Sequence, residues 1–228
     1  MKNLKKLLAL MVALVLALAF VGCTKEEDSK KDTTTKAEEK VADEAVTKVV
    51  EDYMDALCDA DFEGAMDFVD KDAKVYDKLE EQGKGPETGY DALDEVFWDI
   101  QKDIISVAEY EIESSEIEEH SATVIVSANI APDIDGDGNE ILEKYGFEEK
   151  VNGRWSEIIN ENYTYEEVSA MGEDEQEQIG NEATVQATEE VWDEIKNDIL
   201  EECADADMEE YTFELEKDGD DWKIVNIK

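Results

Sequence analysis

An acidic stretch at residues 132–144, PDIDGDGNEILEK, has the side-chain chemistry of a calcium loop. Calcium prefers carboxylate and carbonyl oxygen atoms, and Gly138 stands where such a loop turns sharply. The twelfth position, where a bidentate glutamate would be needed, is Lys144, and no helix is predicted before the loop. A weak calcium site and a plain acidic turn after a strand therefore both remain open. The residues that would supply oxygen ligands are Asp133, Asp135, Asp137 and Asn139.

Two cysteines, Cys58 and Cys203, lie in similar surroundings, LCDADFE and ECADADME, each at the end of an apolar helical stripe. In an oxidising compartment they could pair in a disulfide, and the alternative is two buried free thiols. A catalytic cysteine would need a histidine partner. His120 is the only histidine and lies in an acidic turn, where we expect an ordinary exposed side chain.

The first 22 residues are predicted to be a signal peptide. Lys2, Lys5 and Lys6 form a cationic start, and residues 7–21 are an uncharged, mainly apolar run. This run has the length of a signal-peptide core and is shorter than the roughly 20 residues of a membrane-spanning helix.

Cys23 directly follows Phe20-Val21-Gly22, and this segment resembles the lipobox of bacterial lipoproteins, although leucine is more usual than Phe20. The resemblance implies that the Cys23 thiol takes a thioether lipid and that the chain is cut just before it. A thiol is a good nucleophile for that step, and two or more acyl chains such as palmitate give stable anchoring. The expected location is the outer face of the bacterial cell membrane. The alternative is an ordinary secretory signal.

Residues 23–40 are polar and carry no large apolar side chain, which predicts a disordered tether. Loss of the three leader lysines takes the formal net charge from −43 to −46. Nucleic-acid binding requires a basic surface, so this charge excludes nucleic acid as a partner. The membrane is therefore expected to be reached through the lipid alone.

Helical periodicity dominates the start of the folded region, which we predict to span residues 41–228. Residues 41–57 carry apolar side chains at helical spacing, and Asp61 is placed to cap a short second helix. Residues 90–105 predict a third helix after a loop at 83–89.

The period then changes to two, which indicates strands. Residues 108–117 and 122–130 alternate between apolar and polar side chains, and residues 211–215 and 222–228 flank an Asp-Gly turn typical of a hairpin. Residues 131–207, which lie between these strand pairs, are predicted to be an acidic, largely helical insertion. Together these elements predict an α+β fold.

Within that insertion the pattern varies in strength. Residues 182–203 predict a helix with one apolar stripe, and residues 174–180 predict a loop. Residues 141–172 fit a helix, but the segment KVNGRW could instead turn a hairpin.

Three segments carry a resemblance to the nuclear-transport-factor-2-like fold: VVEDYMDALCDADFEGAMDFV, SATVIVSANIAPDI and DGDDWKIVNIK. The first resembles its paired N-terminal helices, and the others its central strand and closing hairpin. The chain is similar to bacterial surface lipoproteins of this group, with a domain of unknown function and a helical insertion after a strand. The resemblance implies a curved antiparallel sheet packed on N-terminal helices, forming a cone whose mouth can hold a pocket. The positions that approximate the strand pattern are Val124, Val126, Ile130 and Asp135.

That fold hosts enzymes and non-enzymes, so it does not assign chemistry. Its enzymes use an Asp/His or Asp/Tyr pair inside the cone, and no comparable pair is evident in this sequence. We therefore expect a non-catalytic surface domain that binds a small ligand or an envelope protein and needs no cofactor, with the calcium site left open as above. The alternatives are a calcium-binding or structural envelope module and a cone-fold isomerase, dehydratase or hydrolase. The aromatic residues expected in the core or a pocket wall are Tyr53, Tyr110, Trp98 and Trp192.

Overall fold

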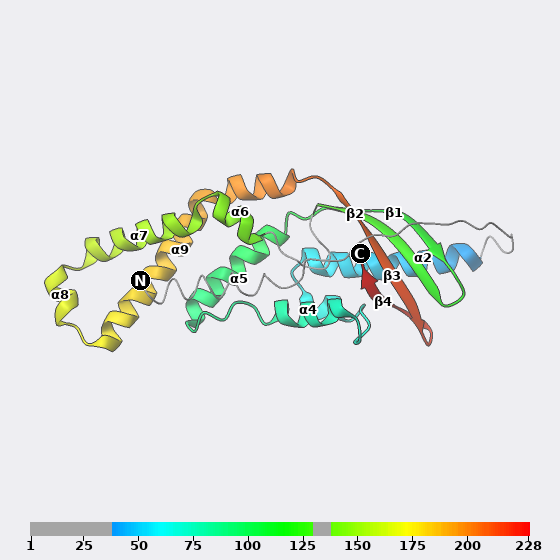
Figure 1. The fold of residues 1–228 in the computed structure, drawn as a ribbon, viewed down its shortest axis with the longest axis horizontal. Helices are drawn as coiled ribbons and strands as arrows, with labels where there is room; N and C mark the ends of the chain where they lie inside the picture. Colours follow the sequence, from blue (N-terminus) through cyan, green and yellow to red (C-terminus); the bar gives the residue numbers. More distant parts are fainter. Residues whose placement is uncertain (1–37, 130–137) are drawn as a thin grey trace.

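The computed structural model describes residues 38–129 and 138–228, and it has the predicted α+β class. An open four-stranded antiparallel sheet follows the N-terminal helices, and a helical segment precedes the C-terminal hairpin (Figure 1). No helix among the described residues has both the length and the apolar character needed to cross a bilayer. The elements in chain order are α2 (Glu38–Cys58), α3 (Phe62–Met66), α4 (Lys74–Gly83), α5 (Asp91–Ile105), β1 (Tyr110–Ile117), β2 (Ser121–Ala128), α6 (Gly138–Lys144), α7 (Phe147–Asn162), α8 (Tyr165–Ala170), α9 (Glu173–Ala204), β3 (Glu209–Asp218) and β4 (Asp221–Ile227).

The four strands pair in chain order, so β2 and β3 form the centre of the sheet. Alternate residues of β2 are buried and face the helices, which is the pattern of a sheet with one covered face. Val124 illustrates the register, because it lies opposite Ser115 of β1 and Phe213 of β3. The predicted hairpin between β3 and β4 is confirmed, with Gly219 at a positive φ of 65° in its turn.

The two edges of the sheet differ. β4 is partly covered, because the backbone N–H of Ile224 donates to the Phe68 carbonyl and the Asp70 N–H donates to the Ile224 carbonyl. β1 has no further strand beside it among the described residues. It carries a register shift after Ile112 and exposes the glutamates at 111, 113 and 116.

Helix α2 covers the sheet with the face that its periodicity predicted. Val46, Val50, Tyr53 and Met54 are almost completely buried, and the Tyr53 ring meets the Phe213 ring edge-on at 5.8 Å. The predicted cap of α3 is also confirmed: the Gly64 N–H donates to the Asp61 carboxylate at 2.9 Å.

No element was predicted for residues 74–83, which form α4. Only Val75 and Leu79 are buried along it, and the other positions are mainly polar or charged. Two apolar residues four apart are too few to stand out as a helical stripe, although they lie on one face and close the core beside β4.

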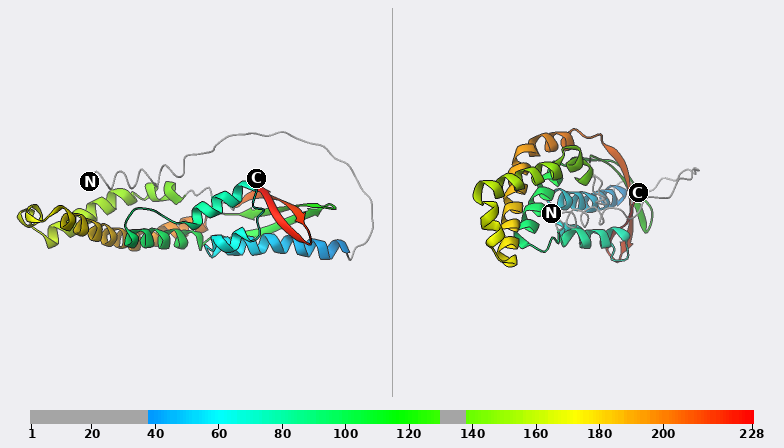
Figure 2. Two further views of the ribbon diagram at one scale, coloured as in Figure 1. Left: turned by 90° about the horizontal axis from the view of Figure 1, so that it is seen from below. Right: turned by 60° about the vertical axis from the view of Figure 1, so that its left-hand side comes forward.

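The buried residues that pack against the sheet form one hydrophobic cluster, which we call the sheet core. A second hydrophobic cluster, which we call the arm cluster, lies outside it. It is built from α5, α7 and α9, and its fully buried members include Ala187 and Ile199. We call α2–α4 with the four strands the sheet unit, and α6–α9 the helical arm. The two parts lie end to end in an elongated molecule, with α2 at one end and α8 at the other (Figures 1 and 2).

The predicted loop at residues 174–180 is wrong, because α9 begins at Glu173 and runs through this segment. Acidic residues in its first turn favour a helix N-terminus. Gly180 is tolerated within the helix, and its carbonyl accepts hydrogen bonds from Trp155 and Thr184. The hairpin alternative for KVNGRW is also wrong, since residues 147–162 form α7 with Gly153 inside it.

Helix α5 joins the two parts. Leu93, Phe97 and Ile100 pack into the arm cluster, whereas Ile105 belongs to the sheet core. On the sheet side, the Trp98 ring lies 5.8 Å from that of Phe62. The arm is therefore fastened to the sheet unit through α5, which contributes residues to both hydrophobic clusters.

Asn129 makes a second connection between the sheet unit and the helical arm. Its amide donates to the carbonyls of Cys203 and Ala204 at the end of α9, at 3.3 and 3.4 Å. Its Oδ1 accepts the Glu109 N–H at 2.7 Å. One side chain thus links the end of α9 to the start of β1.

Candidate functional site

The lipidation residue Cys23 and three predicted calcium ligands, Asp133, Asp135 and Asp137, lie outside the described residues. The fourth predicted ligand, Asn139, belongs to helix α6 and not to a loop. Among the side chains that the structure describes, in residues 43–129 and 141–228, no three of His, Cys, Asp or Glu are grouped to hold a metal ion. Lipidation and calcium binding both stay predictions.

Cys58 and Cys203 are free, half-buried thiols in this structure. The Cys58 Sγ lies 3.9 Å from the Ala108 carbonyl, and Cys203 packs against the arm cluster. Burial raises the pKa of both thiols, and nearby acidic side chains raise it further. Both are therefore protonated and weakly nucleophilic near neutral pH. Their pairing in oxidised protein stays a prediction.

The other residues singled out in the sequence lie either on the surface or in the two hydrophobic clusters. The His120 side chain is 81% exposed in the turn after β1, as expected of an ordinary surface residue. Tyr53 and Trp192 are buried in the sheet core and the arm cluster respectively, and Trp98 packs partly against the sheet core. The Trp192 indole N–H donates to Asp103 of α5 at 2.8 Å.

One tyrosine–carboxylate pair was missed in the sequence. The Tyr110 hydroxyl on β1 donates to the Asp55 carboxylate on α2 at 2.6 Å. Partial burial, and then the hydrogen bond to Asp55, raise the pKa of the Tyr110 phenol well above its ordinary value. A phenol held protonated in this way is a hydrogen-bond donor and not a base, so the pair fastens α2 to β1.

We expect Tyr110→Phe to lower the free energy of unfolding by about 1 kcal/mol at pH 7, the usual net value of one hydrogen bond. Because the folded-state pKa is raised, this contribution is complete below the unfolded pKa of 10.0 and is lost as pH rises through the folded value. Urea denaturation of both proteins at pH 7 and pH 11 measures the difference. A difference that grows with pH would contradict the assignment.

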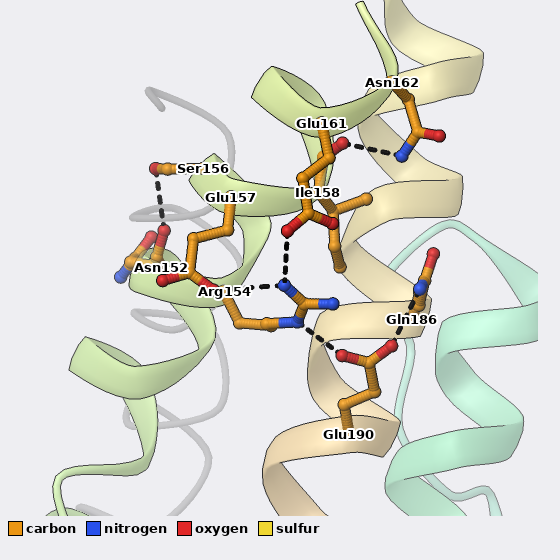
Figure 3. A network of polar contacts seen from close by, with 9 residues as sticks. All are labelled: Asn152, Arg154, Ser156, Glu157, Ile158, Glu161, Asn162, Gln186 and Glu190. Carbon is orange, nitrogen blue, oxygen red and sulfur yellow. Dashed lines mark hydrogen bonds and ion pairs between the residues drawn. The ribbon is translucent and has the colours of Figure 1, made fainter.

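Arg154, the only arginine in the sequence, lies between α7 and α9 (Figure 3). Its Nε donates to Glu190 on α9, and its Nη1 lies 3.1 Å from Glu157 and 3.6 Å from Glu161 on α7. Gln186 donates to the other oxygen of Glu190 at 2.7 Å. One cation thus offsets the mutual repulsion of three carboxylates where the two arm helices meet.

We expect Arg154→Gln to lower the melting temperature by a few degrees at low salt and by less at 1 M NaCl, because salt screens the unbalanced carboxylates. Differential scanning calorimetry measures both. Lys48→Gln is the matched control, because Lys48 pairs with Asp52 within α2, and its other acidic neighbours, Glu51 and Asp55, lie on the same helix. Equal effects of the two substitutions at both salt concentrations would contradict the role given to Arg154.

The difference in stability between the wild-type protein and Arg154→Gln depends on pH through the Glu190 carboxyl. The Arg154 hydrogen bond lowers the Glu190 pKa below its ordinary 4.5. The stability that the pair contributes is therefore complete above pH 4.5 and is lost as pH falls through the lowered value.

The far end of the arm lies outside both hydrophobic clusters and is mostly exposed. We call residues 161–179 the arm tip. None of them belongs to either hydrophobic cluster, and no residue of α8 is buried. Tyr165 on α8 is 87% exposed, more than any other large apolar residue in the part of the chain that the structure describes.

Helix α8 is nevertheless capped by side-chain hydrogen bonds at both ends. At its start, the Glu167 N–H donates to the Thr164 hydroxyl, and the Glu167 carboxylate accepts from the Thr164 N–H at 2.7 Å. That backbone hydrogen bond lowers the pKa of the Glu167 carboxyl. At its end, the Gln176 amide donates to the carbonyls of Val168 and Met171 at 2.9 and 3.1 Å. These hydrogen bonds fix the backbone of α8, so Tyr165 projects from a defined point on the tip, and its ring lies in solvent.

Comparison of the chain with protein-family models, curated proteins and solved structures finds no match.

Proposed function

We propose that this chain is a lipid-anchored, extracytoplasmic binding protein that presents its arm tip to a protein partner away from the membrane. The acylated residue is Cys23, and residues 24–37 connect it to α2. The chain acts by binding and not by catalysis.

The observation that carries the proposal is the opposite placement of two described segments. Helix α2 begins at Glu38, at the sheet end of the molecule, and α8 lies at the other end (Figures 1 and 2). An anchor shortly before α2 would hold the sheet end near the bilayer. The elongated arm would then carry Tyr165 outward.

The electrostatics of the described side chains support binding over chemistry. The Tyr110 phenol and the Cys58 and Cys203 thiols all have raised pKa values, so each stays protonated near neutral pH. The ion pair of Arg154 with Glu190 joins two helices. The phenol and the ion pair fasten elements of the fold to each other, and an exposed aromatic side chain is typical of a protein-binding surface.

Energy transfer to the bilayer tests the orientation. A donor dye is attached through a clickable unnatural amino acid at position 44 of α2 or position 169 of α8, both exposed. The lipidated protein is then reconstituted in vesicles that contain acceptor-labelled lipid. We expect strong transfer from position 44 and weak transfer from position 169.

Cys23→Ser is the matched control. It should give a folded protein that leaves the membrane fraction, lacks the lipid mass and shows no transfer from either position. Equal transfer from positions 44 and 169 in the lipidated protein would rule out an outward arm tip. An unmodified Cys23 in the wild-type protein would rule out the anchor.

A further inference from the structure

The charge around the arm tip is of one sign over a long stretch. No lysine, arginine or histidine occurs between Arg154 and Lys196, and acidic residues recur throughout this stretch. The sheet unit is different, because lysines such as Lys48 and Lys84 are interspersed with its acidic residues and form ion pairs with them. The arm tip is therefore more uniformly acidic than the sheet unit.

Tyr165 belongs to this acidic stretch of the chain. Glu166 and Glu167 follow it on α8, and Glu173 and Asp174 begin α9 after a short connection. All four are exposed. An exposed aromatic ring on a segment whose charged side chains are all acidic matches a partner surface that combines an apolar pocket with a basic rim.

We propose that the partner of the arm tip is a basic protein surface, with a pocket for the Tyr165 ring and lysine or arginine side chains around it. This inference rests on the proposed function, and it adds the chemistry of the partner. Tyr165 supplies the apolar contact, and the carboxylates of the tip steer the partner and fix its orientation.

Charge complementarity also argues against other occupants. A second copy of the chain would bring one acidic tip against another, with no basic residue from 155 to 195 to pair with. Nucleic acids and anionic lipid head groups carry the same sign as the tip and would be repelled. The hydrogen-bonded backbone of α8 limits the backbone entropy lost when the tip binds a protein.

Photo-crosslinking on cells that produce the lipidated protein tests the proposal. p-Benzoylphenylalanine replaces Tyr165 or, as the control, His120, an exposed residue of the sheet unit. We expect an adduct from position 165 that position 120 does not give. Mass spectrometry should place the crosslink within a lysine- or arginine-rich surface of the partner.

Binding of the identified partner to the purified chain then separates the apolar contribution of Tyr165 from the electrostatic contribution of the carboxylates. Tyr165→Ala should weaken binding at least about tenfold, and Tyr165→Phe, which keeps the ring, should change it less than about twofold. Glu166→Lys with Glu173→Lys should weaken binding about tenfold at 50 mM salt and much less at 500 mM. None of these residues is buried, so the variants should fold normally.

The failures of the two proposals are distinguishable. Equal crosslinking from positions 165 and 120 would overturn the binding role of the arm tip. A specific adduct from position 165 with a neutral or acidic surface, or with affinity unaffected by salt and by the two charge reversals, would overturn only the basic partner.

Discussion

Phe213→Ala is expected to lower the free energy of unfolding by about 3–5 kcal/mol, which is the usual cost of truncating a buried aromatic residue to alanine. Phe213 is fully buried on the central strand β3, lies opposite Val124 of β2 and meets the Tyr53 ring of α2. Its removal opens a cavity between the sheet and its covering helix. Urea denaturation followed by circular dichroism measures the loss.

Two variants keep this prediction testable if the alanine protein does not fold. Phe213→Leu fills most of the same space and should cost about 1–2 kcal/mol. Thr212→Ala, at the neighbouring half-buried position of β3, should cost less than about 1 kcal/mol. Equal losses at positions 212 and 213 would mean that β3 does not bury the described face.

Trp192→Ala is expected to cost about 3–5 kcal/mol and to act first on the helical arm. Trp192 is buried among α5, α7 and α9, and its indole N–H donates to Asp103 of α5. The arm packs around a hydrophobic cluster separate from that of the sheet, so unfolding of the arm need not unfold the sheet. Hydrogen exchange should show amides of α7 and α9 losing protection before those of β2 and β3.

Trp192→Phe is the matched control for the arm. It keeps most of the ring but removes the hydrogen bond to Asp103, so it should cost about 1–2 kcal/mol. If Trp192→Ala lowered protection equally in β2 and α9, the arm and the sheet unit would be one cooperative unit. The described separation into two cores would then have no energetic counterpart.

Segments with strong periodicity were predictable from the sequence. Helix α2, strand β2 and the C-terminal hairpin each repeat apolar residues often enough to identify both the element and its buried face. Helix α4 offers only two buried residues, and the start of α9 offers none, so their patterns were too weak or were interpreted as loop. In both, polar helix-forming residues and tertiary context determine the outcome.

The contacts that characterise the site could not be predicted in the same way. Asp55 lies off the buried stripe of α2, and its pairing with Tyr110 depends on where α2 crosses the sheet. The contact of Arg154 with Glu190 likewise depends on how α7 and α9 pack. Thr164 and Glu167, by contrast, have capping-box spacing, which is a signal for α8 that sequence reasoning overlooked.

No described residue pairs with the outer edge of strand β1, and this affects how copies of the protein interact at high density. A free strand edge is a template on which another chain can add a strand, and this hazard grows wherever copies are crowded together. The three glutamates and the bulge of β1 make that edge both like-charged and irregular. Two molecules meeting edge to edge would repel before their backbones could pair, so dense arrays should resist fibrillar aggregation.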